Sequence, residues 1–324
     1  MKRFRKTLTW AILSVSISLA VVMLSHLLSG GFDEFQKIPR RIFLLVGLSY
    51  VALYLIGGLG EYVFIRLLGY RISYIASLEN FFFGNFFSYI TPLYIGGQPF
   101  QIYHFTRVGV KSEDATNFVM TRLFETFMTT IVLSIAGARY AFGELRLSGI
   151  SSVLLKVGFT LQTLWTFLIL LFLLAPGMFS FILKPLLKPL GKSLTEWLET
   201  LKKSIKSVWK RRPYMIVVDS LFWLINVLIH TVPFYLVFRT LQGDFNMGFF
   251  KLTTLLALAS TIAYYAPTPG ASGGVEGTYQ IVFSSIADPA VVASAVFVWR
   301  LFSFYAPIAV GLALSWRVKS WMEE

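Results

Sequence analysis

The stretch that decides the fold reads APTPGASGGVEG and runs from residue 266 to residue 277. Its two prolines, Pro267 and Pro269, and its four glycines are typical of a surface turn. The flanking segments are not, because LTTLLALASTIAYY precedes the stretch and TYQIVFSSIA follows it. The two apolar arms are each too short to cross a bilayer. They therefore predict a helical hairpin that enters the membrane and turns back inside it.

The composition of the whole chain also indicates a membrane protein. Of its 324 residues, 56% are hydrophobic and only 14% are charged, which is outside the range of soluble globular domains. A helix needs about 20 apolar residues to cross a bilayer. Six segments meet this requirement: residues 8–28, 42–65, 118–138, 153–174, 215–238 and 291–316. The sequence predicts an all-α polytopic integral membrane protein, with residues 1–324 forming one transmembrane domain.

The distribution of basic residues predicts the orientation. The formal net charge is +13, but the basic residues gather next to the predicted spans, which argues against a nucleic-acid partner. If the N-terminus is cytoplasmic and there are six spans, nineteen Lys and Arg residues lie on the cytoplasmic side and six on the outer side. This asymmetry follows the positive-inside rule. We therefore expect both termini to be cytoplasmic.

One basic segment, roughly residues 179–212, has the pattern of an amphipathic helix. Its apolar residues recur at helical spacing opposite a row of lysines; they are Leu194, Trp197, Leu198, Leu201, Ile205 and Val208. An ordinary charged loop is less favoured, because Trp and Leu occupy one face. We expect this helix to lie on the membrane surface, with its apolar face in lipid and its lysines on anionic lipid headgroups.

A second broken apolar stretch, residues 78–105, turns at TPLYIGGQP and predicts another hairpin. The flanking charges place its entry on the inner side, opposite to the entry of the first. A constant offset of 178 residues relates the two halves, pairing Gly96 with Gly274, Gln98 with Glu276 and Arg122 with Arg300. The chain is therefore predicted to contain an inverted repeat, roughly residues 41–140 and 213–318. The spans at residues 8–28 and 153–174 are additions to it.

Inverted repeats with broken helices are typical of transporters that bind substrate near the middle of the membrane. Free N–H groups at the start of the second arm of each hairpin attract an anion, and an arginine inside a span can bind phosphate. The predicted substrate-binding residues are Gly96, Gly97, Gln98, Arg122, Gly273, Gly274, Glu276 and Arg300.

Several of these charges also have a purely structural interpretation. Glu125 lies one turn from Arg122 and could form an (i, i+3) ion pair with it. Glu276 is the expected partner of Arg300, either holding the hairpin together or gating a passage. Structural or gating roles are assigned to Pro92, Glu125, Pro267 and Pro269. Glu61 and Asp219 are expected to be anchors at the membrane interface.

The sequence offers little support for catalysis. It contains no cysteine and only three scattered histidines, so neither a metal nor any other cofactor is expected. No Ser/His/Asp constellation or nucleotide-binding motif is present. We therefore expect a protein that is not an enzyme.

The hairpin motifs carry a family resemblance. TPLYIGGQPFQIYHFTRVGV followed by FVMTRLFETF, and PTPGASGGVEG followed by VWRLFSFYAPIAVG, resemble the lysylphosphatidylglycerol synthase transmembrane region. This flippase-like family includes the membrane half of the bacterial multiple peptide resistance factor. The resemblance implies a multi-pass protein of the prokaryotic cell membrane that moves a phospholipid, aminoacylated in the best-known relatives, between leaflets.

At residue level, the resemblance matches most of the predicted site. Many relatives have Gly-Glu where this chain has Gly97-Gln98, so the first hairpin lacks that carboxylate. Fused relatives also carry a cytoplasmic synthase domain, whereas this chain stops at Glu324. A lysyltransferase activity assigned to this chain would therefore be carried over from the fused relatives and not supported by its own residues.

The leading hypothesis is a phospholipid flippase or scramblase whose partners are membrane phospholipids. Three alternatives remain: a carrier for a small anionic solute, a membrane subunit of an aminoacyl-phosphatidylglycerol synthesis system, and a structural partner of another membrane protein. A homodimer or a separate synthase partner is compatible with each of them.

Overall fold

The computed structural model describes residues 2–144, 149–175, 177–178, 192–263 and 265–318. Within these ranges the regular structure is helical, and the extended pairing is limited to a single isolated bridge. This confirms the all-α prediction for the described part of the chain.

Six helices in the described ranges are long and apolar enough to cross a membrane, as predicted. Five are continuous: α1 (Lys2–Ser29), α3 (Arg40–Leu67), α6 (Ser112–Arg139), α7 (Gly149–Leu174) and α10 (Tyr214–Leu241). The sixth begins as α13 (Pro289–Arg300), passes through a π-helical turn, η4 (Leu301–Tyr305), and continues as α14 (Ala306–Ala313).

The remaining helices are shorter. Four of them form the two broken apolar stretches: α4 (Tyr74–Tyr89) with α5 (Gly97–Arg107), and α11 (Phe249–Ala263) with α12 (Gly274–Phe283). The others are α2 (Gly31–Gln36), α9 (Lys192–Lys206), η1 (Tyr140–Glu144), η3 (Ser207–Arg211) and η5 (Ser315–Val318). Thus α3–α4–α5–α6 and α10–α11–α12–α13 follow the same order of long, short, short and long helices.

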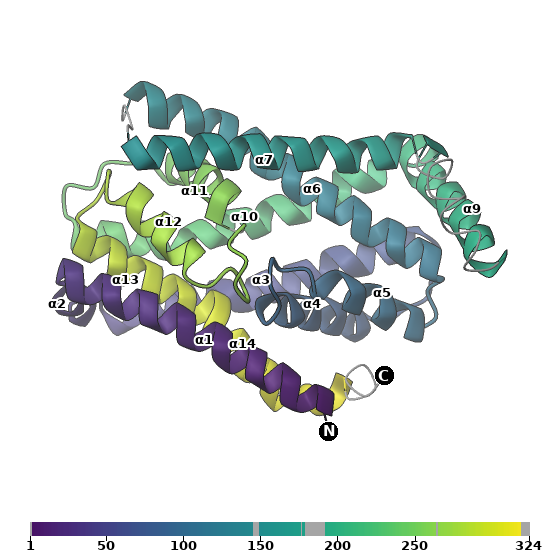
Figure 1. Ribbon diagram of the computed structural model, residues 1–324, viewed down its shortest axis with the longest axis horizontal. Helices are drawn as coiled ribbons and strands as arrows, with labels where there is room; N and C mark the ends of the chain where they lie inside the picture. Colours follow the sequence, from purple (N-terminus) through teal and green to yellow (C-terminus); the bar gives the residue numbers. More distant parts are fainter. Residues whose placement is uncertain (1, 145–148, 176, 179–191, 264, 319–324) are drawn as a thin grey trace.

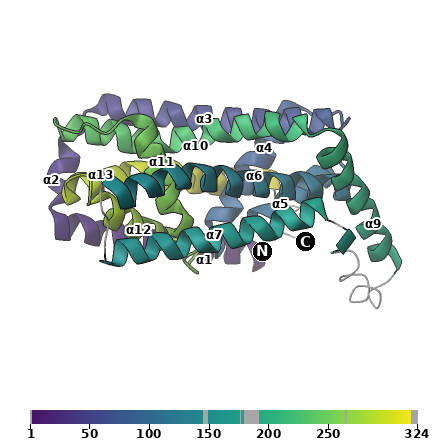
Figure 2. The ribbon, with the colours of Figure 1, turned by 90° about the horizontal axis from the view of Figure 1, so that it is seen from above.

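The long helices run side by side along the longest axis of the molecule (Figure 1). The start of α1 and the end of α14 lie on the same side of the molecule, at the bottom of Figure 1. In Figures 1 and 2, α4 and α5 lie toward the end that carries α9, whereas α11 and α12 lie toward the end that carries α2. The two short-helix pairs therefore occupy different halves of the bundle.

Close packing explains how the first short-helix pair fits against α3. A Cβ atom added at Gly57 would lie 2.2 Å from the ring of Phe81, and one added at Gly58 would lie 2.9 Å from the Cα atom of Leu78. Glycine allows helices to approach this closely inside membranes. The glycines of α3 therefore set the position of α4.

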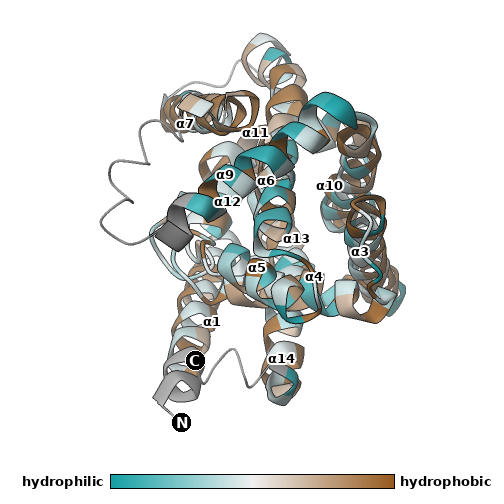
Figure 3. Ribbon diagram, turned by 90° about the vertical axis from the view of Figure 1, so that its right-hand side faces the viewer, coloured by the Kyte–Doolittle hydropathy of each residue, from teal (hydrophilic) through white to brown (hydrophobic). Residues whose placement is uncertain are grey.

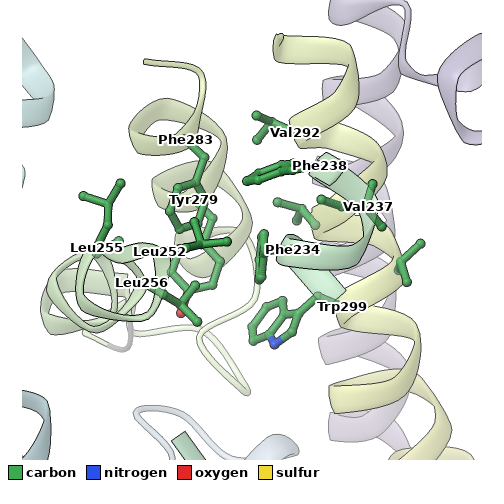
Figure 4. Close-up of a cluster of buried hydrophobic side chains, with 14 of the residues drawn as sticks. Phe234, Val237, Phe238, Leu252, Leu255, Leu256, Tyr279, Phe283, Val292 and Trp299 are labelled. Atoms are coloured by element: carbon green, nitrogen blue, oxygen red, sulfur yellow. The ribbon is translucent and has the colours of Figure 1, made fainter. Parts of the chain in front are cut away.

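An aromatic core fixes the second pair. Phe234 and Phe238 of α10 meet Tyr279 and Phe283 of α12, with ring centroids 5.1–6.2 Å apart, and Trp299 of α13 closes the cluster (Figure 4). Offset and edge-to-face ring pairs add stability beyond the area that they bury. This core binds α12 to two of the long helices.

The outer faces of the long helices are apolar. Helices α3 and α7 are largely brown, that is, hydrophobic, in Figure 3. Large side chains such as Leu44 and Leu48 on α3, and Leu164 and Phe167 on α7, are exposed. Extensive exposed apolar surface is expected where a protein contacts lipid.

Helix α9 has the predicted amphipathic pattern, but its apolar face packs on protein. Leu198, Leu201 and Ile205 are at most 5% exposed, and the last two pack with Phe124 of α6 and Leu173 of α7. The expectation that this face lies in lipid is therefore wrong. Lys203, Lys206 and Lys210 are exposed. Residues 179–191 of the predicted segment lie outside the described residues.

Candidate functional site

The two short-helix pairs meet at their tips, which are residues 90–96 and 265–273. Pro92 and Pro269 form an isolated antiparallel bridge, and the Gly270 N–H donates to the Thr91 carbonyl at 3.1 Å. Two segments from different halves of the chain therefore touch through their backbones. We refer to this contact as the tip junction.

The backbone at the tip junction is unusual. Leu93, Tyr94 and Ala271 have positive φ angles of 55°, 59° and 46°, which non-glycine residues seldom adopt. Gly270 also has a positive φ, and a Cβ atom there would lie 2.4 Å from the Tyr89 carbonyl oxygen. Strained backbone of this kind gathers at binding and switch sites.

The first span contributes directly to this junction. The Ser14 hydroxyl of α1 lies 2.9 Å from the carbonyl of Tyr89, the last residue of α4 before the first tip, and 3.1 Å from the carbonyl of Pro269 on the second tip. A hydroxyl has only one hydrogen to donate, so Ser14 shares it between the end of α4 and the second tip. One turn further on, Ser18 lies 2.8 Å from the Tyr305 hydroxyl and donates to Glu276.

A buried ion pair lies beside the junction. The Nε atom of Arg300 is 2.9 Å from Oε1 of Glu276, and each side chain is 1% exposed. The second oxygen of Glu276 accepts the N–H of Gly273 at 2.8 Å, which caps the start of α12. The predicted pairing of Glu276 with Arg300 is confirmed. Glu276 thus binds its own hairpin and the following span together.

Arg300 retains donor capacity. Neither Nε nor Nη2 has an aligned hydrogen-bond acceptor in the described structure, although both are buried. The guanidinium carbon lies 4.4 Å from the ring centroid of Phe304 and 5.0 Å from that of Trp299. These rings hold the guanidinium group in place through cation–π contacts.

The π turn η4 follows Arg300 directly. Pro307 explains why the helix widens here. A proline inside a helix has no N–H to donate, and its ring clashes with the carbonyl four residues earlier, which is that of Ser303. A wider turn removes this clash. π turns recur at functional sites in helices, and this one begins one residue after the buried arginine.

Gly97 and Gln98 shape the first tip and the start of α5. A Cβ atom at Gly97 would lie 2.2 Å from the Ser88 hydroxyl, so only glycine lets α5 start this close to α4. The Gln98 amide group faces the carbonyls of Ile95 and Tyr94, to which its NH2 can donate at 3.0 and 3.1 Å. Gln98 therefore folds onto its own tip and does not pair with an arginine as Glu276 does.

The remaining predicted residues of both tips lie where the motif places them. Gly96 caps the start of α5 and Gly273 that of α12, which begins at Gly274. Pro92 and Pro269 form the bridge, whereas Pro267 is exposed. Their roles in substrate binding or gating stay predictions.

Arg122 has a partner other than the expected one. Its Nε and Nη2 atoms donate to the two oxygens of Asp219 on α10 at 2.7 and 2.6 Å, a bidentate geometry that strengthens the pair. The predicted ion pair with Glu125 is therefore wrong. The expectation that Glu61 and Asp219 are interfacial anchors is wrong as well, because they are buried inside the protein, with exposures of 0% and 1%.

Arg122 and Arg300 belong to two separate clusters. Around Arg122 lie Asp219, Glu125 and Glu61, whereas around Arg300 lie Glu276, Tyr94 and Tyr305. The described structure gives the two guanidinium groups no partner in common. Among the predicted residues, the tip junction therefore brings together those of the two tips and Arg300, and it leaves Arg122 elsewhere.

Ser14 and Ser18 are not among the predicted site residues, because the first span lies outside the predicted repeat. A signal was present. Ser14 and Ser18 stand four residues apart in a predominantly apolar span, so they share one helix face.

Comparison with known families gives one match. The family described as lysylphosphatidylglycerol synthase TM region matches residues 11–311. A search among curated proteins finds no match. The matched range begins three residues before Ser14 and includes both tips and the Glu276–Arg300 pair.

Proposed function

Because the chain belongs to the lysylphosphatidylglycerol synthase transmembrane-region family, we propose that it moves a phospholipid between the leaflets of a membrane. The observation that carries the proposal is the tip junction, where two broken helix pairs meet beside the buried Glu276–Arg300 pair. In transporters, such broken helices surround the substrate site and part to admit the substrate.

The chemistry at the junction suits an anionic headgroup. Helices α5 and α12 both begin at the tips, and the N-terminus of a helix attracts negative charge. Arg300 supplies donors that have no aligned acceptor. A lipid phosphate between the parted tips would receive both interactions, while the acyl chains stay in the bilayer.

The proposal includes a topology. The two short-helix pairs are re-entrant hairpins that enter from opposite faces, and the units at residues 41–140 and 213–318 are inverted repeats. Both termini and the exposed lysines of α9 face the cytoplasm of a prokaryotic cell, where the lysines contact anionic lipids. The location of the two pairs in different halves of the bundle supports this arrangement.

The test is lipid exchange by the purified protein in liposomes that contain fluorescent phospholipids. Liposomes containing protein are expected to exchange at least one anionic or aminoacylated lipid faster than empty liposomes. Exchange no faster than in empty liposomes, across all headgroups tried, would refute the proposal. Uptake of a soluble anion without lipid exchange would support the alternative of a solute carrier.

We also propose that the chain transports the lipid and does not synthesise it. Incubating the protein with phosphatidylglycerol and charged tRNA is expected to give no aminoacyl lipid. Formation of that product by this chain alone would show that it is an enzyme.

A further inference from the structure

A second buried polar cluster lies between α3, α5, α6 and α10, apart from the tip junction. It consists of Glu61, Gln101, Arg122, Glu125 and Asp219, and we call it the carboxylate cluster. Its four ionisable residues are all buried, with relative exposures of 0% for Glu61, 9% for Arg122, 2% for Glu125 and 1% for Asp219. Three carboxyl groups therefore share one guanidinium group.

The positive charge of the carboxylate cluster, on Arg122, is already paired. Arg122 donates two hydrogen bonds to Asp219, so that pair is close to neutral. Gln101 donates to Oε1 of Glu61 at 2.9 Å, but Oε2 has no partner. Neither oxygen of Glu125 has a hydrogen-bond donor in the described structure. Two carboxyl groups thus lack a counter-ion.

Within the described ranges, the charged groups that act on Glu125 include no cation besides Arg122. Helix α6 packs against α5, α7, α9, α10 and α11. The charged groups that act on Glu125 are Asp219 from α10 and Arg122 from α6 itself. Those that act on Glu61 are Arg122 and Asp219. An unpaired carboxylate at membrane depth is very costly, and a bound proton removes that cost.

A proton on Glu125 also has a structural consequence. Glu125 lies within hydrogen-bonding reach of Asp219, and a carboxyl group can donate to a carboxylate only when it is protonated. The protonated form therefore links α6 to α10. The ionised form places two negative charges against each other between the same helices, which repels them.

We propose that Glu125, assisted by Glu61, is an exchangeable proton site and that proton binding there drives the movement of α6 relative to α10. The proton comes from water, forms one O–H bond on a carboxyl oxygen and returns to water when that bond breaks. Coupling of this step to lipid movement rests on the proposed function, whereas the proton site itself does not.

The proton site is tested without transport. Infrared difference spectra of the protein in lipid are recorded across a pH titration to detect the C=O stretch of protonated carboxyl groups. Glu125→Gln is expected to remove a titrating band, and Glu61→Gln to shift or remove a second one. Glu113→Gln, on the same helix but outside the cluster, should leave both bands. Bands that are unchanged in both cluster variants would overturn the proton site.

The coupling is tested by lipid exchange at different pH values and under an imposed pH gradient. A one-proton step changes the rate by at most about tenfold per pH unit. The wild type and Glu113→Gln should show this dependence, and a folded Glu125→Gln protein should lose it. Should Glu125→Gln not fold, Glu61→Gln is expected to reduce the dependence in the same assay.

The outcomes separate the two proposals. Lipid exchange that is independent of pH in the wild type, or that depends on Na⁺ and not on pH, would overturn the proton coupling and leave lipid transport standing. No exchange under any condition would refute lipid transport, while the infrared result would still decide the proton site.

Discussion

Replacing Glu276 by glutamine is the sharpest test of how the tip junction is held. The substitution keeps the size of the side chain but removes the carboxylate that pairs with Arg300. Glutamine can still accept one hydrogen bond, from either Ser18 or the Gly273 N–H, but it leaves a buried guanidinium without a counter-charge.

The expected cost follows from burial. Both side chains are 1% exposed, and removing one partner of a buried ion pair typically costs about 3–5 kcal/mol. Because glutamine retains an acceptor, we expect about 3 kcal/mol, the lower end of this range. At about 2 °C per kcal/mol for a chain of this size, the apparent Tm should fall by about 6 °C.

The assay is thermal unfolding of the purified protein in detergent, followed by intrinsic fluorescence. Glu34→Gln is the matched control, since Glu34 pairs with Lys37 at an exposed position and surface pairs add little; its Tm should equal that of the wild type. The double variant Glu276→Gln with Arg300→Gln should be less destabilised than the sum of the singles. A Glu276→Gln protein as stable as the wild type would refute this reasoning.

Two further predictions use the same measurement. Gly97→Ala should lower the stability by about 1–3 kcal/mol, because the added Cβ atom would lie 2.2 Å from the Ser88 hydroxyl. The control is Gly277→Ala, which should not lower the stability, because a Cβ atom there has nothing within 4 Å. Equal Tm values for the two variants would contradict the close packing of α4 and α5. Asp219→Asn should lower the free energy of unfolding by about 3 kcal/mol or more, because it leaves Arg122 without its bidentate partner. No loss of stability would show that this pair does not hold α6 to α10.

The sequence was sufficient to predict the positions of the spans and of the two tips. Span positions follow from the length of apolar runs, which the bilayer thickness fixes, and each predicted span coincides with a helix. The tips follow from proline and glycine, which end helices locally. The pairing of Glu276 with Arg300 was also predictable, because a buried charge needs a partner and the span that holds Arg300 contains no carboxylate of its own.

The partners of Arg122 and the role of α1 were not predictable in this way. Asp219 is 97 residues away from Arg122 in sequence, on a helix whose first turn follows Arg211 and Arg212, so its position suggested the membrane interface. Only the packing of α10 against α6 and α3 buries it. Ser14 and Ser18 likewise gain their meaning from contacts with residues more than 250 positions later.

The same limit applies to α9. Its helical periodicity was correct, but periodicity does not say whether lipid or protein covers an apolar face. In the structure, the apolar face of α9 packs against α6 and α7. The distinction matters for function, because a helix bound to two spans moves with them, whereas a helix lying on headgroups moves independently.

A reversible cross-link between the two tips tests the proposal that lipid passes where they meet. The chain contains no cysteine, so Pro92→Cys and Pro269→Cys together introduce a single possible disulfide. Directly bridged antiparallel residues have Cα atoms about 4.5–5.5 Å apart, which is within the range of a disulfide. Oxidation of the double variant is expected to stop lipid exchange in liposomes and reduction to restore it, while each single variant continues to exchange. Full exchange with the tips cross-linked would contradict the account.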